Sequence, residues 1–189
     1  IDWTGKNTIR YVARSGGGNV ISTFNVETER ALPGTGEAYQ QSISAGEEAL
    51  SLSRSGSYAF IASSYAAPPE VFVSRGPAHP LLQVTHLNDG LRPAWGKSES
   101  VEWENDGFKV QGWLLYPANY DASKKYPLIV GVHGGPSASV TPRWPGVGYG
   151  EVPFSALGYF VFMPNPRGSY GQGEKFTQAN VKDFGYGDL

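Results

Sequence analysis

Short apolar runs separated by turn-forming residues fill residues 1–92. The first two runs are Ile9–Ala13 and Val20–Val26, and the glycine-rich stretch Gly16–Asn19 lies between them. Two such runs joined by a glycine-containing turn are typical of a β-hairpin. Apolar residues at helical spacing are lacking here, so we expect this part of the chain to be built from strands.

The hairpin pattern recurs about 50 residues later. Tyr58–Ala62 matches the first run, Val71–Val73 matches the second, and Ala67–Pro69 takes the turn position. A period of about 40 to 50 residues is typical of the four-stranded blades of β-propellers. We therefore predict two blades in residues 1–92, too few to close a ring, which takes at least about four. The alternative is a small β-sandwich in which two hairpins match by coincidence.

The pattern changes after residue 92, where we place the boundary between a first domain, 1–92, and a second, 93–189. Ser98–Glu104 alternates weakly between apolar and polar residues, and Phe108–Tyr116 resumes as a strand-like run. Between them lies Asn105–Gly107, a strong hairpin signal because Asn-Asp-Gly accommodates a tight turn. A second hairpin is therefore expected to open the second domain.

Two continuous apolar runs follow, Leu128–Val132 and Tyr159–Met163. Unbroken runs are expected of strands that are covered on both faces in a parallel sheet. Between them Val152–Leu157 predicts a short helix, which Gly158 can cap. Such a strand–helix–strand crossover is typical of α/β sheets, which bind ligands beyond the carboxyl ends of their strands. Catalytic or ligand-binding residues are therefore expected directly after these two runs.

The sequence His133-Gly134-Gly135-Pro136 comes directly after the first of these runs. Two glycines at this place let the main chain approach a substrate, so the N–H group of Gly134 or Gly135 can stabilise a developing oxyanion. This is the position of the oxyanion loop in α/β-hydrolases. We expect His133 to support the loop through an imidazole hydrogen bond. A tight turn and simple packing of the histidine are the alternatives without catalytic function.

A second loop, Asn165–Gly173, follows the next run and reads NPRGSYGQG. With its HGGP and arginine-glycine-serine loops in this order, the chain resembles the prolyl oligopeptidase family of serine peptidases, particularly its acylaminoacyl-peptidase and dipeptidyl-aminopeptidase branches. The resemblance implies a mixed fold, in which β-propeller blades are followed by the N-terminal part of an α/β-hydrolase domain. Further stretches that resemble the family are Pro69–Val73, Val84–Asn88, 107–117, Tyr126–Leu128, Gly173–Phe176 and Asp183–Asp188.

The family's nucleophilic serine lies farther along the chain, in a GxSxG elbow followed by an aspartate and a histidine. No serine here has a glycine both two positions before it and two positions after it. Ser169 has Gly171 two positions after it but Arg167 two positions before it, and Ser137 has Gly135 two positions before it but Ser139 two positions after it. We expect Ser169 to be a loop hydroxyl bonded to nearby backbone. The resemblance therefore implies a fragment that supplies the oxyanion loop, lacks the Ser/Asp/His triad and is inactive without the remainder of the hydrolase domain.

Several other polar residues are better explained without a catalytic or binding role. His79 and His86 suit surface turns, so no metal site and no cofactor are expected. The pair Glu47-Glu48 resembles the glutamates that bind the substrate amine in dipeptidyl peptidases. In that family, however, the pair lies far upstream, on an early blade, so a solvated turn is the better interpretation here.

Arg167 could clamp a carboxylate, but the family resemblance favours a structural ion pair, for which Glu174 and Asp188 are the candidate partners. The five tryptophans are expected to serve packing rather than substrate contact. The same is expected of Tyr149-Gly150, which lies in the proline-rich loop 141–153.

Composition narrows the class of function. The chain carries 15 basic and 17 acidic residues, a net charge of −2, and so has no basic field for nucleic acid or an anionic membrane. A hydrophobic content of 40% indicates a packed protein, and the absence of cysteine excludes disulfides and thiolate metal sites. No apolar run is long enough for a membrane span.

The preferred interpretation is part of a serine peptidase that hydrolyses short peptides by acyl transfer, with the peptide substrate and the remainder of the hydrolase domain as partners. An esterase or lipase of the same fold and a non-catalytic, peptide-binding propeller are the alternatives, and a homo-oligomer stays open.

Overall fold

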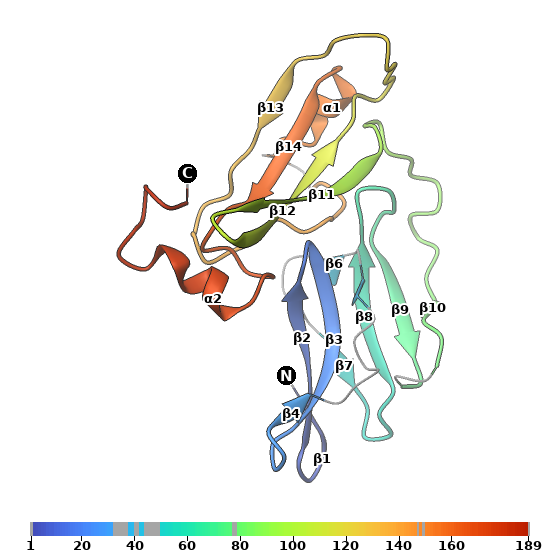
Figure 1. Ribbon diagram of the computed structural model, residues 1–189. Helices are drawn as coiled ribbons and strands as arrows, with labels where there is room; N and C mark the ends of the chain where they lie inside the picture. The colour runs from blue at the N-terminus through green and yellow to red at the C-terminus, as the bar shows by residue number, and fades with distance from the viewer. Residues whose placement is uncertain are drawn as a thin grey trace.

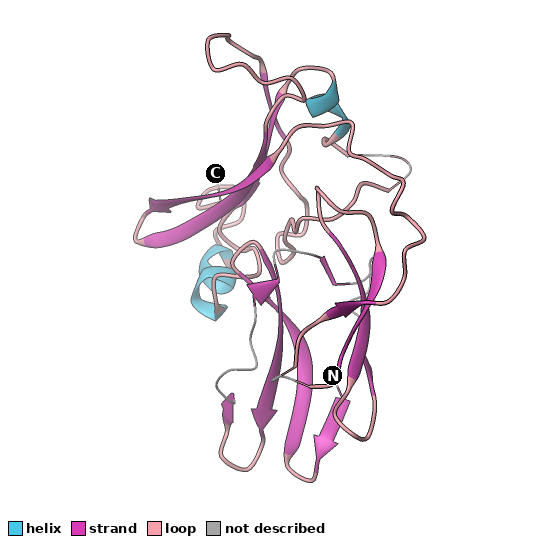
Figure 2. Cartoon of the chain, turned by 90° about the vertical axis from the view of Figure 1, so that its right-hand side faces the viewer, coloured by secondary structure: helices cyan, strands magenta, loops and turns pink. Residues whose placement is uncertain are grey.

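The computed structural model describes residues 2–31, 38–39, 42–43, 50–76, 79–146, 148 and 150–188. Within these ranges the chain forms three β-sheets, two short α-helices and one 3-10 turn. Two sheets stand side by side in the lower half of Figure 1, and the third lies across their upper ends. The same arrangement is visible from the side in Figure 2.

The first sheet contains the first predicted hairpin. Its strands are β1 (Asp2–Gly5), β2 (Thr8–Ser15), β3 (Gly18–Asn25), β4 (Arg30–Ala31) and β5 (Ala38–Tyr39). β2 pairs antiparallel with β1 and β3, and both β4 and β5 pair with β3. Because Ser15 pairs with Gly18, the hairpin turn consists of Gly16 and Gly17. The predicted hairpin is thus confirmed, with a tighter turn than expected.

The second sheet repeats this arrangement. Its strands are β6 (Ser42–Ile43), β7 (Ser51–Leu52), β8 (Tyr58–Ser63), β9 (Glu70–Ser74) and β10 (Leu82–Gln83). All pairings are antiparallel, in the order β10-β9-β8-β6 with β7 also on β8. Ile21 of the first sheet joins Tyr58, Phe60 and Ala62 of the second in one buried cluster. The described part of residues 1–92 is all-β, which is consistent with the predicted propeller blades.

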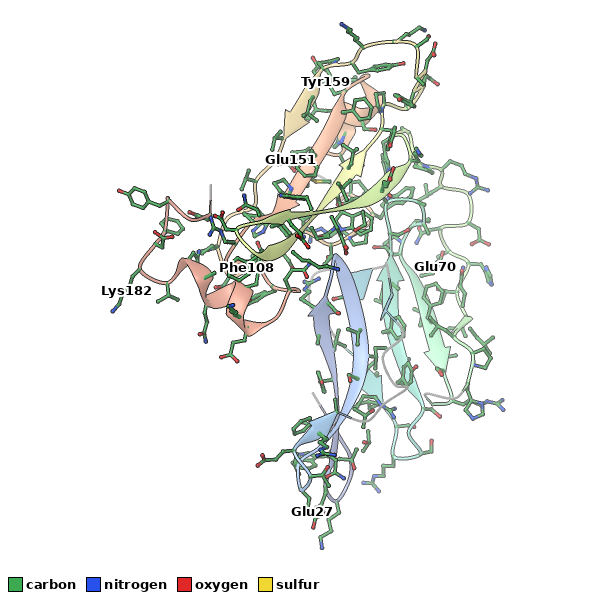
Figure 3. All side chains as sticks on the ribbon, viewed as in Figure 1. Glu27, Glu70, Phe108, Glu151, Tyr159 and Lys182 are labelled. Carbon is green, nitrogen blue, oxygen red and sulfur yellow. The ribbon has the colours of Figure 1, made fainter. Side chains whose placement is uncertain are left out.

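Glu70 of β9 anchors the loop that leaves the second sheet (labelled in Figure 3). Its side chain is only 5% exposed, and its carboxylate accepts hydrogen bonds from the backbone N–H of Asn88, at 2.6 Å, and from the Thr85 hydroxyl. These hydrogen bonds, with the Thr85 bond foremost, lower the pKa of Glu70 from its ordinary value.

Replacing Glu70 by glutamine is expected to destabilise the protein at neutral pH, because an amide cannot accept both hydrogen bonds through ionised oxygens. A lowered folded-state pKa contributes stability above the unfolded pKa of about 4.3, and that contribution is lost as the pH falls through the folded value. The gap in unfolding free energy between wild type and Glu70→Gln should therefore narrow in urea titrations below about pH 4. The exposed Glu104 gives the matched control, Glu104→Gln, and an equally wide gap at all pH values would contradict the assignment.

The third sheet is mixed. Its strands are β11 (Ser98–Asn105), β12 (Phe108–Leu115), β13 (Leu128–Val130) and β14 (Phe160–Asn165), in the order β11-β12-β14-β13. β13 and β14 are parallel and the other pairs antiparallel. The β11–β12 turn consists of Asp106 and Gly107, at φ 49° and 75°, as a type I′ hairpin turn requires. The predicted hairpin and the parallel crossover are both present.

The crossover carries the helix α1 (Pro153–Ala156). Its end is a Schellman motif, since Gly158 donates to the carbonyl of Ser155 and Tyr159 to that of Phe154, both at 3.2 Å. Gly158 has φ +93°, which confirms its predicted capping role. The helix is shorter than predicted by one residue at each end.

One expectation for the crossover is wrong. β13 is not covered on both faces, because Leu128 and Val130 are more than half exposed. The physical reason is that β13 is the last strand of the sheet, paired with β14 alone, and that no described element covers the face on which both Leu128 and Val130 lie. β14 fits the expectation better, since Val161 and Met163 are buried and Phe160, Phe162 and Pro164 are partly buried.

Two further elements follow β14. The helix α2 (Glu174–Thr177) continues into a 3-10 turn, Gln178–Asn180. Phe176 of α2 is buried against Phe108, which lies at the start of β12 (labelled in Figure 3), with ring centroids 5.6 Å apart. Among the described helices, none has the length and apolar character that crossing a membrane would require.

A buried aromatic cluster joins the second and third sheets. Tyr65, from the β8–β9 loop, packs edge-to-face on Trp113 of β12 at 5.8 Å, together with Leu115, Val161 and Met163. Burial raises the pKa of Tyr65 well above its ordinary range, and its hydroxyl lies 3.9 Å from the sulfur of Met163. The third sheet is therefore packed against the propeller-like sheets through a shared core.

The tip of the β2–β3 hairpin makes a second junction with the third sheet. Trp113 Nε1 donates to the carbonyl of Gly17 at 3.0 Å, and the N–H of Gly16 donates to the carbonyl of Gly171 at 2.9 Å. Arg14 donates to the hydroxyl of Thr141 at 3.0 Å. Two of these three bonds end on backbone carbonyls of glycines, which lack side chains that would keep the segments apart.

Candidate functional site

The two loops that the sequence singles out leave neighbouring ends of β13 and β14. Because these strands are parallel, their carboxyl ends meet at one edge of the sheet. The loops are bonded directly to one another, since the N–H of Tyr170 donates to the carbonyl of Ala138 at 2.8 Å. Asn165, the last residue of β14, accepts from the N–H of Val140 at 2.7 Å. The first loop, 131–140, thus rests on the second, 165–173.

His133 makes the imidazole hydrogen bonds expected of a loop-supporting residue. Its Nδ1 lies 2.9 Å from the carbonyl oxygen of Gly134, and its Nε2 lies 2.9 Å from the hydroxyl oxygen of Ser169. A carbonyl can only accept, so Nδ1 carries a hydrogen and donates to Gly134, and in this tautomer Nε2 accepts a hydrogen bond from the Ser169 hydroxyl. One imidazole therefore holds both loops together.

Ser169 is fully buried, and its hydroxyl bonds the His133 imidazole rather than the nearby backbone that the sequence predicted. Its N–H donates to the carbonyl of Pro166 at 3.0 Å, and its own carbonyl accepts from the hydroxyl of Thr177 at 2.9 Å. A nucleophile must be open to a substrate carbonyl, so this environment does not suit attack by Ser169 despite its contact with a histidine.

Gly134 and Gly135 lie exposed at the tip of the first loop. In the described part of the chain, neither of their N–H groups has a hydrogen-bond acceptor. Gly135 has φ +146°, and a Cβ placed there would lie 2.9 Å from the nitrogen of Ser137, whereas a Cβ at Gly134 would meet open space. The backbone at Gly135 thus requires glycine, and both amides are available to a ligand that accepts hydrogen bonds.

The ion pair predicted for Arg167 exists, but both candidate partners were wrong. Arg167 Nη2 lies 3.1 Å from a carboxylate oxygen of Asp106, in the β11–β12 turn, rather than from Glu174 or Asp188. The hairpin turn reaches the arginine loop because β12 and β14 are adjacent in the sheet. This antiparallel neighbour relation brings the two residues together across 61 positions of sequence.

The remaining polar candidates stay away from the two loops. His86 Nδ1 lies 2.9 Å from Asp89 in an exposed turn, and His79 donates its backbone N–H to the carbonyl of Gly76 at 3.0 Å. Over the described ranges, no three histidine, aspartate or glutamate side chains come together as they would in a metal site. Glu47-Glu48 and Tyr149 lie outside the described residues.

Four of the five tryptophans pack against other side chains, although only Trp113 is buried. Trp95 and Trp144 are in edge-to-face contact at 4.8 Å, and Trp103 lies 5.7 Å from Phe162. Trp113 is buried, whereas Trp3 is 62% exposed on β1. The backbone N–H of Trp144 donates to Ser63 Oγ at 3.2 Å, which ties loop 141–153 to the second sheet.

Two buried side-chain amides at this site, those of Asn165 and Gln111, are not predicted by the sequence. Asn165 belongs to the second loop motif and Gln111 to a strand-like run, and neither pattern indicates a role for the amide. The available signal was a polar residue followed by the apolar stretch Gly112–Leu115. If such a strand is buried, its polar side chain is buried with it, and buried polar side chains nearly always have a hydrogen-bond partner.

Comparison with known proteins adds a family relation. No model of a protein family matches the chain. Probable dipeptidyl-peptidase 5 of Aspergillus terreus is 35% identical over 130 residues, which cover 66% of this chain and 17% of the relative. Dipeptidyl-peptidase 5 of Schizosaccharomyces pombe is 38% identical over 79 residues, covering 42% of this chain and 11% of the relative. The chain thus matches only about a sixth or less of the length of these relatives.

Solved structures share the fold over nearly the whole chain. An acylaminoacyl peptidase in complex with Z-Gly-Gly-Phe-chloromethyl ketone has a TM-score of 0.76 at 18% identity, covering 97% of this chain and 27% of that protein. A Mycobacterium tuberculosis puromycin-hydrolyzing peptidase has a TM-score of 0.66 at 17% identity, covering 98% and 28%. At these identities the likeness concerns the fold alone.

Proposed function

We propose that this chain, which belongs to the prolyl oligopeptidase family of serine peptidases, supplies the oxyanion loop of a peptidase whose catalytic triad lies elsewhere in the complete protein. Relatives named as dipeptidyl peptidases support peptide hydrolysis as the activity. A fold neighbour that holds a peptide-derived chloromethyl ketone supports peptide binding. These names favour a peptidase over an esterase of the same fold.

The two halves of the chain belong to different domains in this proposal. Residues 1–92 are the last blades of a propeller, and residues 93–189 are the beginning of an α/β-hydrolase domain. In support, the first two sheets are antiparallel, whereas the third contains a parallel crossover with a helix between its strands. Acyl-transfer sites in hydrolase folds lie at the carboxyl ends of such strands.

One observation carries the proposal, namely two exposed glycine N–H groups without acceptors directly after a parallel strand. In acyl transfer a serine attacks the carbonyl carbon, a histidine takes the serine proton, and the carbonyl oxygen becomes negatively charged. The N–H of Gly134 or Gly135 would donate to that oxygen. The Nδ1–H of His133 donates to the Gly134 carbonyl, which orients the peptide unit that contains the Gly135 N–H.

The complete protein is expected to hydrolyse dipeptidyl or N-blocked aminoacyl anilides and to react covalently with a fluorophosphonate probe. The labelled serine should lie outside residues 1–189, and these residues expressed alone should neither react nor hydrolyse the anilides. Labelling is located by mass spectrometry of the digested protein. Covalent label on Ser169 or Ser137, or anilide hydrolysis by the 189 residues alone, would overturn the proposal.

A further inference from the structure

A pair of buried side-chain amides lies directly beneath the candidate oxyanion loop. Gln111 of β12 is fully buried and Asn165 at the end of β14 is 1% exposed. Asn165 Nδ2 donates to Gln111 Oε1 at 2.8 Å, and Gln111 Nε2 donates to the hydroxyl of Ser100 at 3.0 Å. The sheet itself sets this contact, because Gln111 and Asn165 are direct register partners across β12 and β14.

The other hydrogen bonds of the Asn165 side chain are made to Val140 of the loop. Its Oδ1 accepts from the N–H of Val140 at 2.7 Å, and its Nδ2 donates to the carbonyl of Val140 at 3.1 Å. With one amide hydrogen on Gln111 and the other on Val140, both donors are used. The side chain is thus bonded to Val140 as a neighbouring strand would be, and it cannot rotate without losing several buried hydrogen bonds.

The loop is fixed at both ends by these contacts. At its start, the N–H of Gly131 donates to the carbonyl of Phe162 at 2.9 Å and His133 bonds Ser169. At its end, Asn165 holds Val140. Gly134 and Gly135 are exposed and lie between the two anchors. The bond from the Tyr170 N–H to the Ala138 carbonyl adds a third contact between the glycines and Val140. The position of the glycines is therefore determined by these contacts together.

We propose that Asn165, oriented by Gln111, is a positioning residue that sets where the Gly134 and Gly135 N–H groups lie. The proposal rests on the function proposed above, because it concerns the oxyanion donors of that site. Oxyanion donors stabilise a transition state only when they are aimed in advance at the developing charge, and a shift of about 1 Å can cost about 100-fold in rate. Asn165 touches no reacting atom and acts through Val140.

The first sheet contacts the same amide pair through Gly17. Gly17, in the β2–β3 turn, lies so close to Gln111 that a Cβ at that position would be 2.4 Å from Gln111 Nε2. Gly17 has an ordinary φ, so alanine is not strained by the backbone and acts through this contact alone. The propeller-like part thus reaches the loop through Gln111 and Asn165, and Gly17 gives a remote means of disturbing it.

The test uses the complete protein with the variants Asn165→Ala, Gln111→Ala and the double variant. For each Asn165 or Gln111 variant, kcat for a dipeptidyl anilide should fall about 10- to 100-fold while KM changes by less than about 2-fold. Because the two amides act as a unit, the double variant should be no slower than about 2-fold below the worse single variant. Gln178→Ala, which removes an exposed amide bonded to Glu174, is the matched control and should keep wild-type kcat.

Titration of active serines with a fluorophosphonate separates positioning from mere loss of folded protein. The expected result is a lower kcat per titrated serine, whereas an unchanged kcat per titrated serine would overturn the positioning role. Gly17→Ala is the second variant, usable even where Asn165→Ala does not fold. It should lower kcat on the order of 5-fold, against the control Gly90→Ala, where a Cβ meets open space. If wild type is itself inactive and unlabelled, the proposed function fails, whereas an active wild type with unaffected variants overturns the positioning role alone.

Discussion

Replacing Gly135 by alanine in the complete protein is expected to lower kcat for a dipeptidyl anilide by about 100- to 1,000-fold, the usual cost of losing one oxyanion donor. The reason is local geometry. Alanine is strained at φ +146°, and its Cβ would lie 2.9 Å from the Ser137 nitrogen and 3.2 Å from the Ala138 Cβ. The loop must shift to relieve these contacts, and the Gly134 and Gly135 N–H groups shift with it.

The Gly135→Ala effect should be confined to catalysis. Because Gly135 is exposed, the loop can relax toward solvent, and the urea midpoint should change little. Steady-state kinetics with urea unfolding by circular dichroism measure both quantities, and Gly90→Ala again gives the matched glycine control. Wild-type kcat in Gly135→Ala would show that this loop does not bind the oxyanion.

Replacing Trp113 by alanine should lower the free energy of unfolding by about 3–5 kcal/mol, the range for deleting a large buried aromatic side chain. Trp113 is 3% exposed, packs against Tyr65 and lies in the core that joins the second and third sheets. Its loss opens a cavity there and also removes the hydrogen bond to the Gly17 carbonyl. Urea unfolding followed by far-ultraviolet circular dichroism measures the change without relying on tryptophan fluorescence.

Trp113→Phe separates packing from hydrogen bonding. It keeps most of the ring but leaves the Gly17 carbonyl without its donor, at a cost of about 1–3 kcal/mol. Leu87 is 87% exposed, so Leu87→Ala should change the free energy of unfolding by no more than about 0.5 kcal/mol. Equal losses for Trp113→Ala and Leu87→Ala would contradict the assignment of Trp113 to a shared core.

Local patterns of sequence predicted the elements of this fold because each has a local physical cause. The Asp106–Gly107 turn, the cap at Gly158 and the repeated hairpins follow from residues that lie next to one another in the chain. The exposure of β13 could not be predicted in this way. An apolar run indicates a strand that is suited to burial, but its place in the order of the sheet decides how much of it is covered.

The candidate site was predictable to the same extent. The two loops could be expected to meet, since parallel neighbouring strands end at one edge of a sheet. The partner of Arg167 could not, because Asp106 reaches it only through the pairing of β12 with β14. The Gln111–Asn165 contact has the same origin, as these two residues are 54 positions apart and meet only through the register of β12 and β14.

The edge position of β13 also bears on aggregation. An edge strand presents unpaired backbone N–H and C=O groups, and strands with apolar side chains at such an edge readily pair with other chains. Leu128 and Val130 on this strand, and Val132 just after it, expose apolar side chains. Where nothing covers this segment, it is expected to pair with strands of other copies and so to promote aggregation.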